Sequence, residues 1–420
     1  MTRALPARIR RASAAALVGG ALAALTACTA VAPMPTPTPT PTETVAPSGD
    51  GVLRIGTLFP TTGATSFLGA AQVAGVNAAA REINAAGGVL GERIEIVNRN
   101  SGSAGSDTAK KSFAALVEKG VDVIIGPSSS AIAEELLPLA AEAGIPLISP
   151  AATYPQLTSV DADGMLFRTI PSYPHQGTVL GPLLGDASVA LITGGDAVTS
   201  TIESTLAASL EEAGGELVVT AEAGSSSSVA SAVSAVKAAD PDVVVLATID
   251  NGDTTQSLIT KLTAAGLGKD KLWLTSQNLA DYSQALPAGT LTGAHGVLEG
   301  VRADDAFRAR LEKEDPGLSS TRYAPEAYDA VIIAALAATM ADDDGGPSIR
   351  SRILDVTREG IRCSSFGECL DVLTTEPDIA YEGITGPLRL DDAGDPTVAV
   401  YGVYEYSSKN RYARAKSVSG

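Results

Sequence analysis

The segment VDVIIGPSSSAIAEELLPLAAEAGIPLIS (121–149) decides the fold of this chain. Its two ends, VDVIIG and IPLIS, are short apolar runs typical of buried strands. The stretch between them has helical character and ends at Gly144, a residue type that commonly closes a helix. Strands that are apolar throughout and alternate with helices predict a parallel sheet covered by helices on both faces.

The same alternation extends in both directions along the chain. Strand-like runs precede the segment at 53–58 and 93–98, and the pattern restarts at 188–193, 216–221, 242–248 and 271–276, with helical stretches such as 199–213 and 254–265 between them. We therefore expect an α/β fold of two doubly wound parallel-sheet lobes. A late apolar alternation at 397–406, after further helices, indicates that the chain crosses between the lobes more than twice.

The first residues have the pattern of a secretory signal. Four arginines precede a small and apolar run over 14–25, which is too short to span a membrane. The run ends in LTAC at Cys28, which resembles the bacterial lipoprotein signal, in which the cysteine receives lipid and becomes the first residue. An ordinary signal with a chance cysteine is the alternative. The Pro/Thr-rich stretch that follows favours extended, disordered chain and would serve as a tether.

Composition limits the classes of partner. The chain has 30 basic and 48 acidic residues, and removing the four arginines of the predicted signal leaves 26 basic residues and a net charge of −22. Such a surface repels nucleic acid, so we expect no nucleic-acid partner. About 370 residues remain after the tether, enough for two domains of ordinary size.

Two further cysteines, Cys363 and Cys369, lie close together in CSSFGEC. Outside the cytoplasm such a pair favours a disulfide, which would stabilise the chain by about 2 kcal/mol. A metal site is the alternative, although two cysteines with no nearby histidine make a poor zinc site.

The topology itself predicts a binding place. Ligands of open parallel sheets sit beyond the carboxyl ends of the strands, where helices begin with unpaired N–H groups. Ser128, Ser129 and Ser130 follow the strand that ends at Gly126, and Thr153 follows the next strand. Hydroxyl and N–H groups there suit a carboxylate, but serine is also a common N-cap, so position alone leaves both roles open.

Motifs of catalysis are missing from the sequence. It contains no G-x-S-x-G, H-E-x-x-H, G-x-x-x-x-G-K-[ST] or G-x-G-x-x-G pattern and only two histidines, His175 and His295. We therefore expect no enzyme, no catalytic residue, no metal and no cofactor.

Five stretches in order along the chain resemble one known family. IGTLFPTTG, EINAAGGVLGERIEI, VIIGPSSS, PLISPAATYPQLT and EAYDAV are similar to the type I solute-binding proteins of ABC importers, and most to the Leu/Ile/Val-binding branch. The resemblance runs from about Leu53 to Tyr406, and CSSFGEC with DIAYEGITGPLRL resembles a subgroup. It implies two doubly wound lobes joined by a three-segment hinge near 171–173, 299–302 and 395–398, which close over a ligand.

The resemblance also assigns candidate ligand-binding residues. Ser128 to Ser130, the backbone of Ala151 and the hydroxyl of Thr153 match first-lobe contacts to the α-carboxylate and ammonium of an amino acid. Where amino-acid binders place an acidic residue and aromatic residues, this chain departs from the family. The further candidates are Gln277 at the acidic position, Leu68 at a first-lobe aromatic position, Asp250 and Asn251 near a second-lobe tyrosine, and Tyr323, for which core packing is the alternative.

The sequence thus predicts the following organisation: a lipoprotein signal (1–27), an anchor and tether (28–51), lobe 1 (52–171 and 301–395), lobe 2 (172–300 and 396–410) and a tail (411–420). The resemblance implies a monomeric lipoprotein on the extracytoplasmic face of the cell membrane. It would capture a small polar solute, such as a branched-chain-like amino acid or a related amide, for an ABC permease. A sensor that signals to a membrane receptor or kinase, and more remotely a surface enzyme, are the alternatives.

Overall fold

The computed structural model describes residues 45–62, 65–160 and 163–420. Residues 45–420 form one compact unit that contains all the core clusters among them. The predicted signal (1–27), Cys28 and most of the predicted tether lie outside the described residues. The last residues of the predicted tether do not form a free segment. The backbone N–H groups of Ser48 and Gly49 donate to the buried carboxylate of Asp343, at 3.1 and 3.0 Å, and that of Gly51 donates to Asp344 at 2.9 Å.

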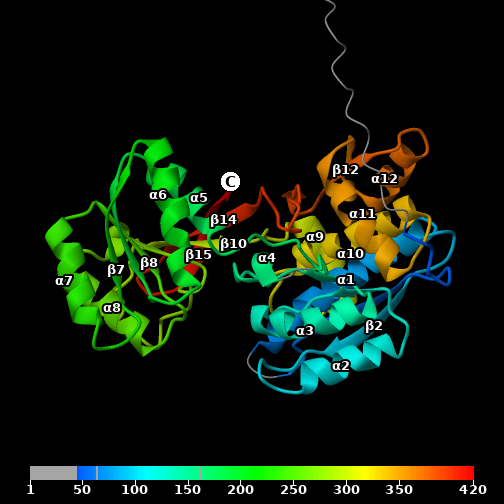
Figure 1. The fold of residues 1–420 in the computed structure, drawn as a ribbon. Helices are drawn as coiled ribbons and strands as arrows, with labels where there is room; N and C mark the ends of the chain where they lie inside the picture. Colours follow the sequence, from blue (N-terminus) through cyan, green and yellow to red (C-terminus); the bar gives the residue numbers. More distant parts are fainter. Residues whose placement is uncertain (1–44, 63–64, 161–162) are drawn as a thin grey trace, which may run out of the picture. The chain divides into compact units, whose positions relative to one another are not determined.

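The first sheet is parallel throughout, as predicted. Its strand order is β2-β1-β3-β4-β5, and the strands are β1 (Arg54–Phe59), β2 (Glu95–Asn100), β3 (Val123–Ile125), β4 (Leu147–Ser149) and β5 (Leu166–Arg168). The helices of this lobe are α1 (Ser66–Ala85), α2 (Thr108–Val117), α3 (Ser130–Ala143), α4 (Leu157–Val160), α9 (Asp305–Glu314), α10 (Ala324–Ala341), α11 (Gly346–Arg358) and α12 (Phe366–Leu373). Figure 1 shows α9 to α12, from late in the chain, beside the first strands and helices.

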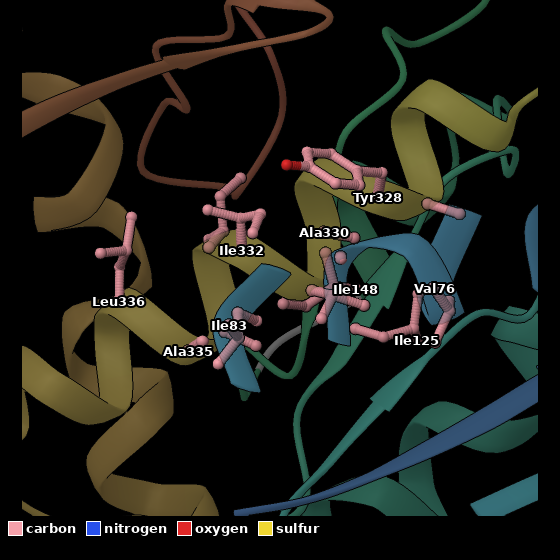
Figure 2. Packing of buried hydrophobic residues seen from close by; sticks show 14 of the residues in the cluster. Val76, Ile83, Ile125, Ile148, Tyr328, Ala330, Ile332, Ala335 and Leu336 are labelled. Carbon is pink, nitrogen blue, oxygen red and sulfur yellow. The ribbon is translucent and has the colours of Figure 1, made fainter. Parts of the chain in front are cut away.

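The central strand β3 is buried on both faces of this sheet, which explains why its sequence, VII, is apolar at every position. Val123 and Ile125 point into one hydrophobic cluster, while Ile124 between them points into another. Successive side chains of a strand alternate between faces, so a sheet covered on both sides needs apolar residues at consecutive positions. Figure 2 shows Ile125 and Ile148 of the first cluster packed near Val76 and Ile83 of α1 and near α10.

Helix α10 alone among the described helices is long and apolar enough to cross a membrane by length and composition. Its residues from Ala324 to Ala338 are all buried in the protein. Small side chains permit close packing: a Cβ at Gly75 of α1 would lie 2.2 Å from the carbonyl oxygen of Ala324. We therefore describe α10 as the core helix of lobe 1.

The second sheet has the order β15-β14-β10-β9-β8-β6-β7. Its parallel part is β6 (Ser188–Thr193), β7 (Glu216–Glu222), β8 (Val243–Ala247), β9 (Leu272–Leu274) and β10 (His295–Glu299), and α5 (His175–Leu184), α6 (Ile202–Ala213), α7 (Val229–Ala239) and α8 (Asp253–Ala264) accompany it. Antiparallel β14 (Val400–Tyr406) and β15 (Tyr412–Ser419) complete it. The tail predicted at 411–420 is therefore wrong, because 412–419 pair with β14 as an edge strand.

Three segments of chain connect the two sheets, as predicted. The chain leaves lobe 1 after β5, returns after β10 and leaves again before β14. A small third sheet of β11 (Ile361–Cys363), β12 (Ile379–Gly383) and β13 (Gly386–Pro387) belongs to the late part of lobe 1.

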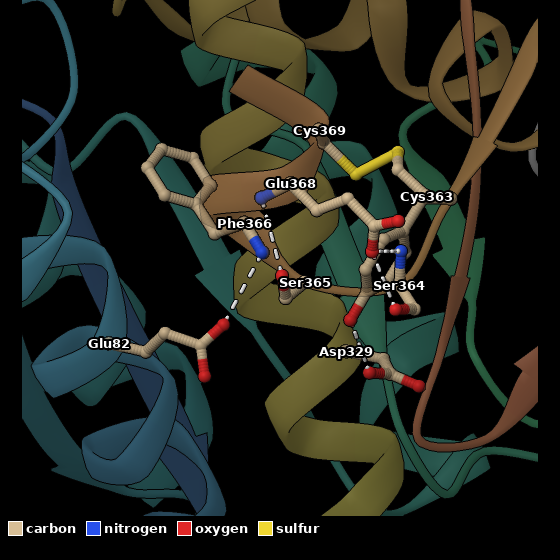
Figure 3. Close-up of a disulfide and its surroundings, with 9 residues drawn as sticks. Glu82, Asp329, Cys363, Ser364, Ser365, Phe366, Glu368 and Cys369 are labelled. Carbon is tan, nitrogen blue, oxygen red and sulfur yellow. Dashed lines mark hydrogen bonds between the residues drawn. A yellow bond between two sulfur atoms is a disulfide. The ribbon is translucent and has the colours of Figure 1, made fainter. Parts of the chain in front are cut away.

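A disulfide joins Cys363 and Cys369 in this region (Figure 3). Between the two cysteines, Ser365 caps α12 by accepting a hydrogen bond from the N–H of Glu368 at 3.3 Å, and the Glu368 carboxylate accepts from the N–H of Ser364 at 2.8 Å. These bonds satisfy N–H groups that a helix start leaves unpaired. The loop closed by the disulfide is therefore also held by its own polar groups.

Candidate functional site

A pocket of about 310 Å³ lies beyond the carboxyl ends of β1, β2 and β3. It is lined by Pro60, Thr65, Leu68, Ser101, Gly102, Ser103, Ala104, Ser128, Ser129 and Ile132. Three of the predicted site residues, Leu68, Ser128 and Ser129, are among them. We call this cavity the serine pocket, because serine supplies four of its lining residues.

Close approach of backbones at two glycines shapes the serine pocket. Gly126, which precedes the serines, has φ +119°, and a Cβ there would lie 2.6 Å from the carbonyl oxygen of Leu58. A Cβ at Gly69, in the first turns of α1, would lie 1.9 Å from the carbonyl oxygen of Pro60. Neither position accepts a side chain without movement of the backbone. Glycine at both positions therefore lets the chain at Gly126 and the start of α1 approach the end of β1 closely.

Ser128 is held by α1. Its hydroxyl donates to the side-chain carbonyl of Gln72 at 2.8 Å, and the amide nitrogen of Gln72 donates in turn to the backbone oxygen of Leu68 at 3.1 Å. Gln72 is fully buried. Because the proton of Ser128 is committed to Gln72, the oxygen of Ser128 is left to accept from a ligand donor.

Ser130, the first residue of α3, has a positioning role that its place in the sequence did not reveal. Its hydroxyl oxygen accepts from the backbone N–H groups of Thr153 and Tyr154, at 3.0 and 3.2 Å. Ser149 supports the same loop, since its hydroxyl accepts from the N–H of Ala152 at 3.0 Å and donates to the carbonyl of Pro127 at 2.7 Å. The predicted residues Ser130, Ala151 and Thr153 are thus brought together, although none of the three lines the serine pocket.

The sequence did not reveal the residue that holds the loop after β4, which contains Thr153 and Tyr154. Arg168, at the end of β5, is fully buried and pairs with Asp395. Its guanidinium also donates to the backbone oxygen of Tyr154 at 3.0 Å and to the hydroxyl of Thr158 at 2.7 Å. Asp395 begins the third predicted hinge segment, so this ion pair ties the loop after β4 to a hinge.

The three second-lobe candidates follow the carboxyl ends of neighbouring strands. Gln277 comes after β9 and is half-buried, while Asp250 and Asn251 are exposed in the loop after β8. Asp250 is engaged locally, because its carboxylate accepts from the N–H of Gly252 at 2.8 Å and its backbone oxygen accepts from Asn278 at 2.6 Å. None of these three residues lines the serine pocket, and their contact with a ligand stays a prediction.

Tyr323 also lies away from the serine pocket. It is buried, and its hydroxyl donates to Glu299 at 3.0 Å and accepts from Arg322 at 2.7 Å. Tyr323 is among the residues that line a second pocket beside β10. Tyr323 therefore lines a different cavity from the candidates Leu68, Ser128 and Ser129.

A buried carboxyl group holds the second connecting segment. Glu326, in the first turn of α10, accepts from the N–H of Val301 at 2.7 Å, and its backbone oxygen accepts from the hydroxyl of Thr169 at 2.8 Å. Burial raises the pKa of Glu326 to about 8, above the ordinary range for a carboxyl group, since the charged form loses its hydration. Glu326 therefore connects the start of α10 to two of the three connecting segments, the first through Thr169 and the second through Val301.

The chemistry of the serine pocket is that of binding. Its lining presents hydroxyls and the N–H groups at the start of α3, and it includes no ionisable side chain. Such a lining can hold a small polar molecule by hydrogen bonds. In the part of the chain that the structure describes, no group of three or more His, Cys, Asp or Glu is placed to hold a metal ion.

Two doubly wound lobes, three crossings and a hydroxyl-lined pocket at the strand ends define a two-lobed small-molecule-binding protein. The chain belongs to the family described as Periplasmic binding protein, whose sequence profile matches residues 52–368.

Individual relatives agree with this membership. An amino acid binding protein of Pseudomonas aeruginosa is 26% identical over 372 residues, covering 85% of this chain and 91% of its own length. A Leu/Ile/Val-binding protein homolog of Brucella abortus is 37% identical, but over only 147 residues, so the match spans 38% of that relative's length.

Solved structures share the fold at lower identity. The branched-chain amino acid transporter substrate binding protein LivJ from Streptococcus pneumoniae, in complex with isoleucine, has a TM-score of 0.59 at 23% identity and covers 88% of this chain and 100% of its own. A solute binding protein from R. palustris in complex with benzoate has a TM-score of 0.57 at 22% identity, covering 88% of this chain and 98% of its own. These likenesses confirm the predicted type I periplasmic-binding-protein fold.

Proposed function

We propose that this chain is the substrate-binding lipoprotein of an ABC importer. It captures a small amino acid, branched-chain-like, or a related amide, and delivers it to a permease in the membrane. The observation that carries the proposal is the uncharged, hydroxyl-lined serine pocket at the strand ends of a fold whose relatives are binding proteins for amino acids. Lipid on Cys28 would hold the protein at the extracytoplasmic face of the membrane as a monomer.

The serine pocket supports a ligand with both donors and acceptors. The oxygen of Ser128 is free to accept, while the N–H groups at the start of α3 are free to donate to a carboxylate or amide oxygen. Gln277, Asp250 and Asn251 would complete the site from lobe 2 when the lobes close. Closure follows from ligand binding only if the closed state binds the ligand better than the open state does.

Gln277 makes the choice between amino acid and amide testable. An acidic residue at this position would pair with an ammonium group, and a charge-assisted bond is about twice as strong as a neutral one. A neutral glutamine removes that preference, so an amide that lacks the ammonium should bind nearly as well as the matching amino acid.

The test is isothermal titration of residues 45–420 with leucine, isoleucine, valine, isovaleramide and a sugar as a negative control. We expect binding of the amino acids or the amide. Ser128→Ala should weaken binding about tenfold, since the charged or polar partner loses a hydrogen bond. Ser231→Ala, on the exposed surface of α7, is the matched control. Binding that Ser128→Ala and Ser231→Ala leave equally unchanged would place the ligand elsewhere.

The transport role needs a separate measurement in cells. Deleting the gene should abolish uptake of the radiolabelled ligand identified by titration, and restoring the wild-type chain should recover it. Normal uptake after deletion, together with tight binding in vitro, would favour a sensing role over import.

A further inference from the structure

A second pocket, of about 210 Å³, lies beside the end of β10. It is lined by Leu298, Glu299, Gly300, Val301, Arg302, Ser320, Thr321, Arg322, Tyr323, Tyr404, Tyr412 and Arg414. It shares no lining residue with the serine pocket. Because three of its lining residues are arginines, we call it the arginine pocket.

The charge of the arginine pocket is opposite to that of the protein. Arg302, Arg322 and Arg414 face a single acidic residue, Glu299, in a chain whose formal net charge is −18. Within the described part of the chain, none of these three arginines forms an ion pair. An excess of two positive charges in one small cavity attracts an anion.

Two buried atoms in the arginine pocket lack hydrogen-bond partners. They are Nε of Arg322, a donor, and Oε2 of Glu299, an acceptor whose other carboxylate oxygen accepts from Tyr323. Glu299 is only 5% exposed. A buried polar atom without a partner is costly, so each of these atoms indicates a complementary group that a bound molecule could supply.

The tyrosines limit the size and shape of the occupant. Tyr404 and Tyr412 pack edge to face, with ring centroids 5.3 Å apart, and the guanidinium carbon of Arg322 lies 4.8 Å from the centroid of the Tyr323 ring. Aromatic rings around guanidinium groups form a rigid wall, because the cation–π contact fixes the arginine. A cavity of this volume has room for a molecule of a few carbon atoms.

We propose that the arginine pocket is a second ligand site, specific for a small carboxylate that also carries a hydrogen-bond donor. The carboxylate oxygens pair with Arg302, Arg414 and Nε of Arg322, and the donor, a hydroxyl or an amino group, bonds to Oε2 of Glu299. A hydroxy dicarboxylate would match both the two excess positive charges and the unpartnered acceptor. This site does not depend on the importer role or on the serine pocket.

Malate and succinate provide a sharp pair of probes, because they differ by one hydroxyl group. A site that bonds a substrate hydroxyl discriminates strongly against the analogue that lacks it, since the buried partner is then left unpaired. We expect DL-malate to bind residues 45–420 at least about tenfold more tightly than succinate. Glu299→Gln should reduce this ratio, because the amide no longer offers a charged acceptor.

Variants of the two more accessible arginines, Arg302 and Arg414, test ligand binding without disturbing the fold. Arg302 is exposed and Arg414 half-buried, so the double variant Arg302→Ala/Arg414→Ala should fold, with an unchanged circular dichroism spectrum. It should weaken malate binding at least about tenfold. Lys416→Ala is the matched control, since it removes a positive charge from the same strand, β15, outside the pocket. Ser128→Ala should also leave malate binding unchanged.

The measurement is isothermal titration calorimetry at fixed ionic strength. Malate binding that the double variant loses and the Lys416→Ala variant keeps would support the arginine pocket. The absence of malate binding up to about 10 mM, or equal binding by wild type and double variant, would overturn the proposal. Equal affinity for malate and succinate in the wild type would overturn the role of Glu299.

Discussion

The buried ion pair of Arg168 and Asp395 provides the sharpest test of how the structure is held. Replacing Arg168 with methionine keeps much of the side-chain volume but removes the guanidinium and leaves its polar partners in place. The backbone oxygens of Ala152 and Tyr154 and the hydroxyl of Thr158 each lose the bond from Arg168, and the carboxylate of Asp395 loses its counter-charge. These groups belong to the loop after β4, to the short helix α4 that follows it, or to the third connecting segment.

The expected loss in the free energy of unfolding is about 3–5 kcal/mol, the usual cost of breaking a buried ion pair by removing one partner. The cost comes mainly from the charge left behind. The double variant Arg168→Met/Asp395→Leu removes both charges and should recover a large part of the loss. We therefore expect the two single-variant losses to sum to at least about 2 kcal/mol more than the loss in the double variant.

The assay is urea unfolding at neutral pH, followed by circular dichroism. Arg81→Met is the control, because Arg81 forms a bidentate pair with Glu314 at 2.7 and 3.0 Å but its side chain is 68% exposed. The Glu314 side chain is 10% exposed, but because Arg81 stays hydrated we expect a loss of about 1 kcal/mol, well below that of the buried pair. Equal losses in Arg168→Met and Arg81→Met, or losses in the Arg168/Asp395 cycle that simply add, would refute the reasoning.

Three further predictions follow from other regions of the chain. Glu326→Gln should stabilise the protein increasingly as the pH rises from about 5 to 9, measured by thermal unfolding. The pKa of Glu326 in the folded protein is raised to about 8, so below the ordinary carboxyl pKa the group is protonated and its contribution to stability is fully present. That contribution is lost as the pH rises through 8, whereas glutamine carries no charge at any pH. A gap that stays constant with pH would contradict this assignment. Replacing both Cys363 and Cys369 with serine should lower the free energy of unfolding by about 2 kcal/mol under oxidising conditions, and adding a reductant should remove the difference from wild type. Cys28→Ala should move the protein from the membrane fraction to the soluble fraction in cell fractionation and abolish its labelling by radioactive palmitate, whereas a labelled Cys28→Ala protein would exclude this anchor.

Strands buried on both faces could be predicted closely from the sequence. The run SVALIT was expected at 188–193, and β6 has the same bounds. A strand that is buried on both faces needs apolar residues at consecutive positions, and polar or glycine-rich turns flank it. Such a run can be recognised in a single sequence without an alignment. The edge strand β15 was missed for the opposite reason: with Arg414, Lys416 and two serines it is mostly exposed and lacks an apolar run. Its pairing with β14 depends on a neighbour rather than on its own composition.

The position of the three serines after a strand end could be predicted, but not the hydrogen bonds that each side chain makes. Topology places Ser128 to Ser130 beyond a strand end, as the structure confirms. Whether a hydroxyl is free or committed depends on partners far along the chain. Ser128 bonds Gln72, 56 residues away, and Ser130 bonds the loop at Thr153. Arg168 gave no signal at all, since its partner is 227 residues away and a lone arginine at the end of a short strand has no local pattern.

The contrast between the two pockets shows why net charge cannot identify the ligand of this protein. The formal charge of −18 arises mostly from exposed carboxylates, and their effect at long range is screened over about 8–10 Å at physiological salt. Within a cavity, only adjacent groups set the preference. The serine pocket has no ionisable lining, and the arginine pocket has an excess of two positive charges. An anion approaching the arginine pocket is therefore repelled at a distance and attracted at contact. Added salt should first increase its association rate, because screening weakens the long-range repulsion more than it weakens the partly buried contacts.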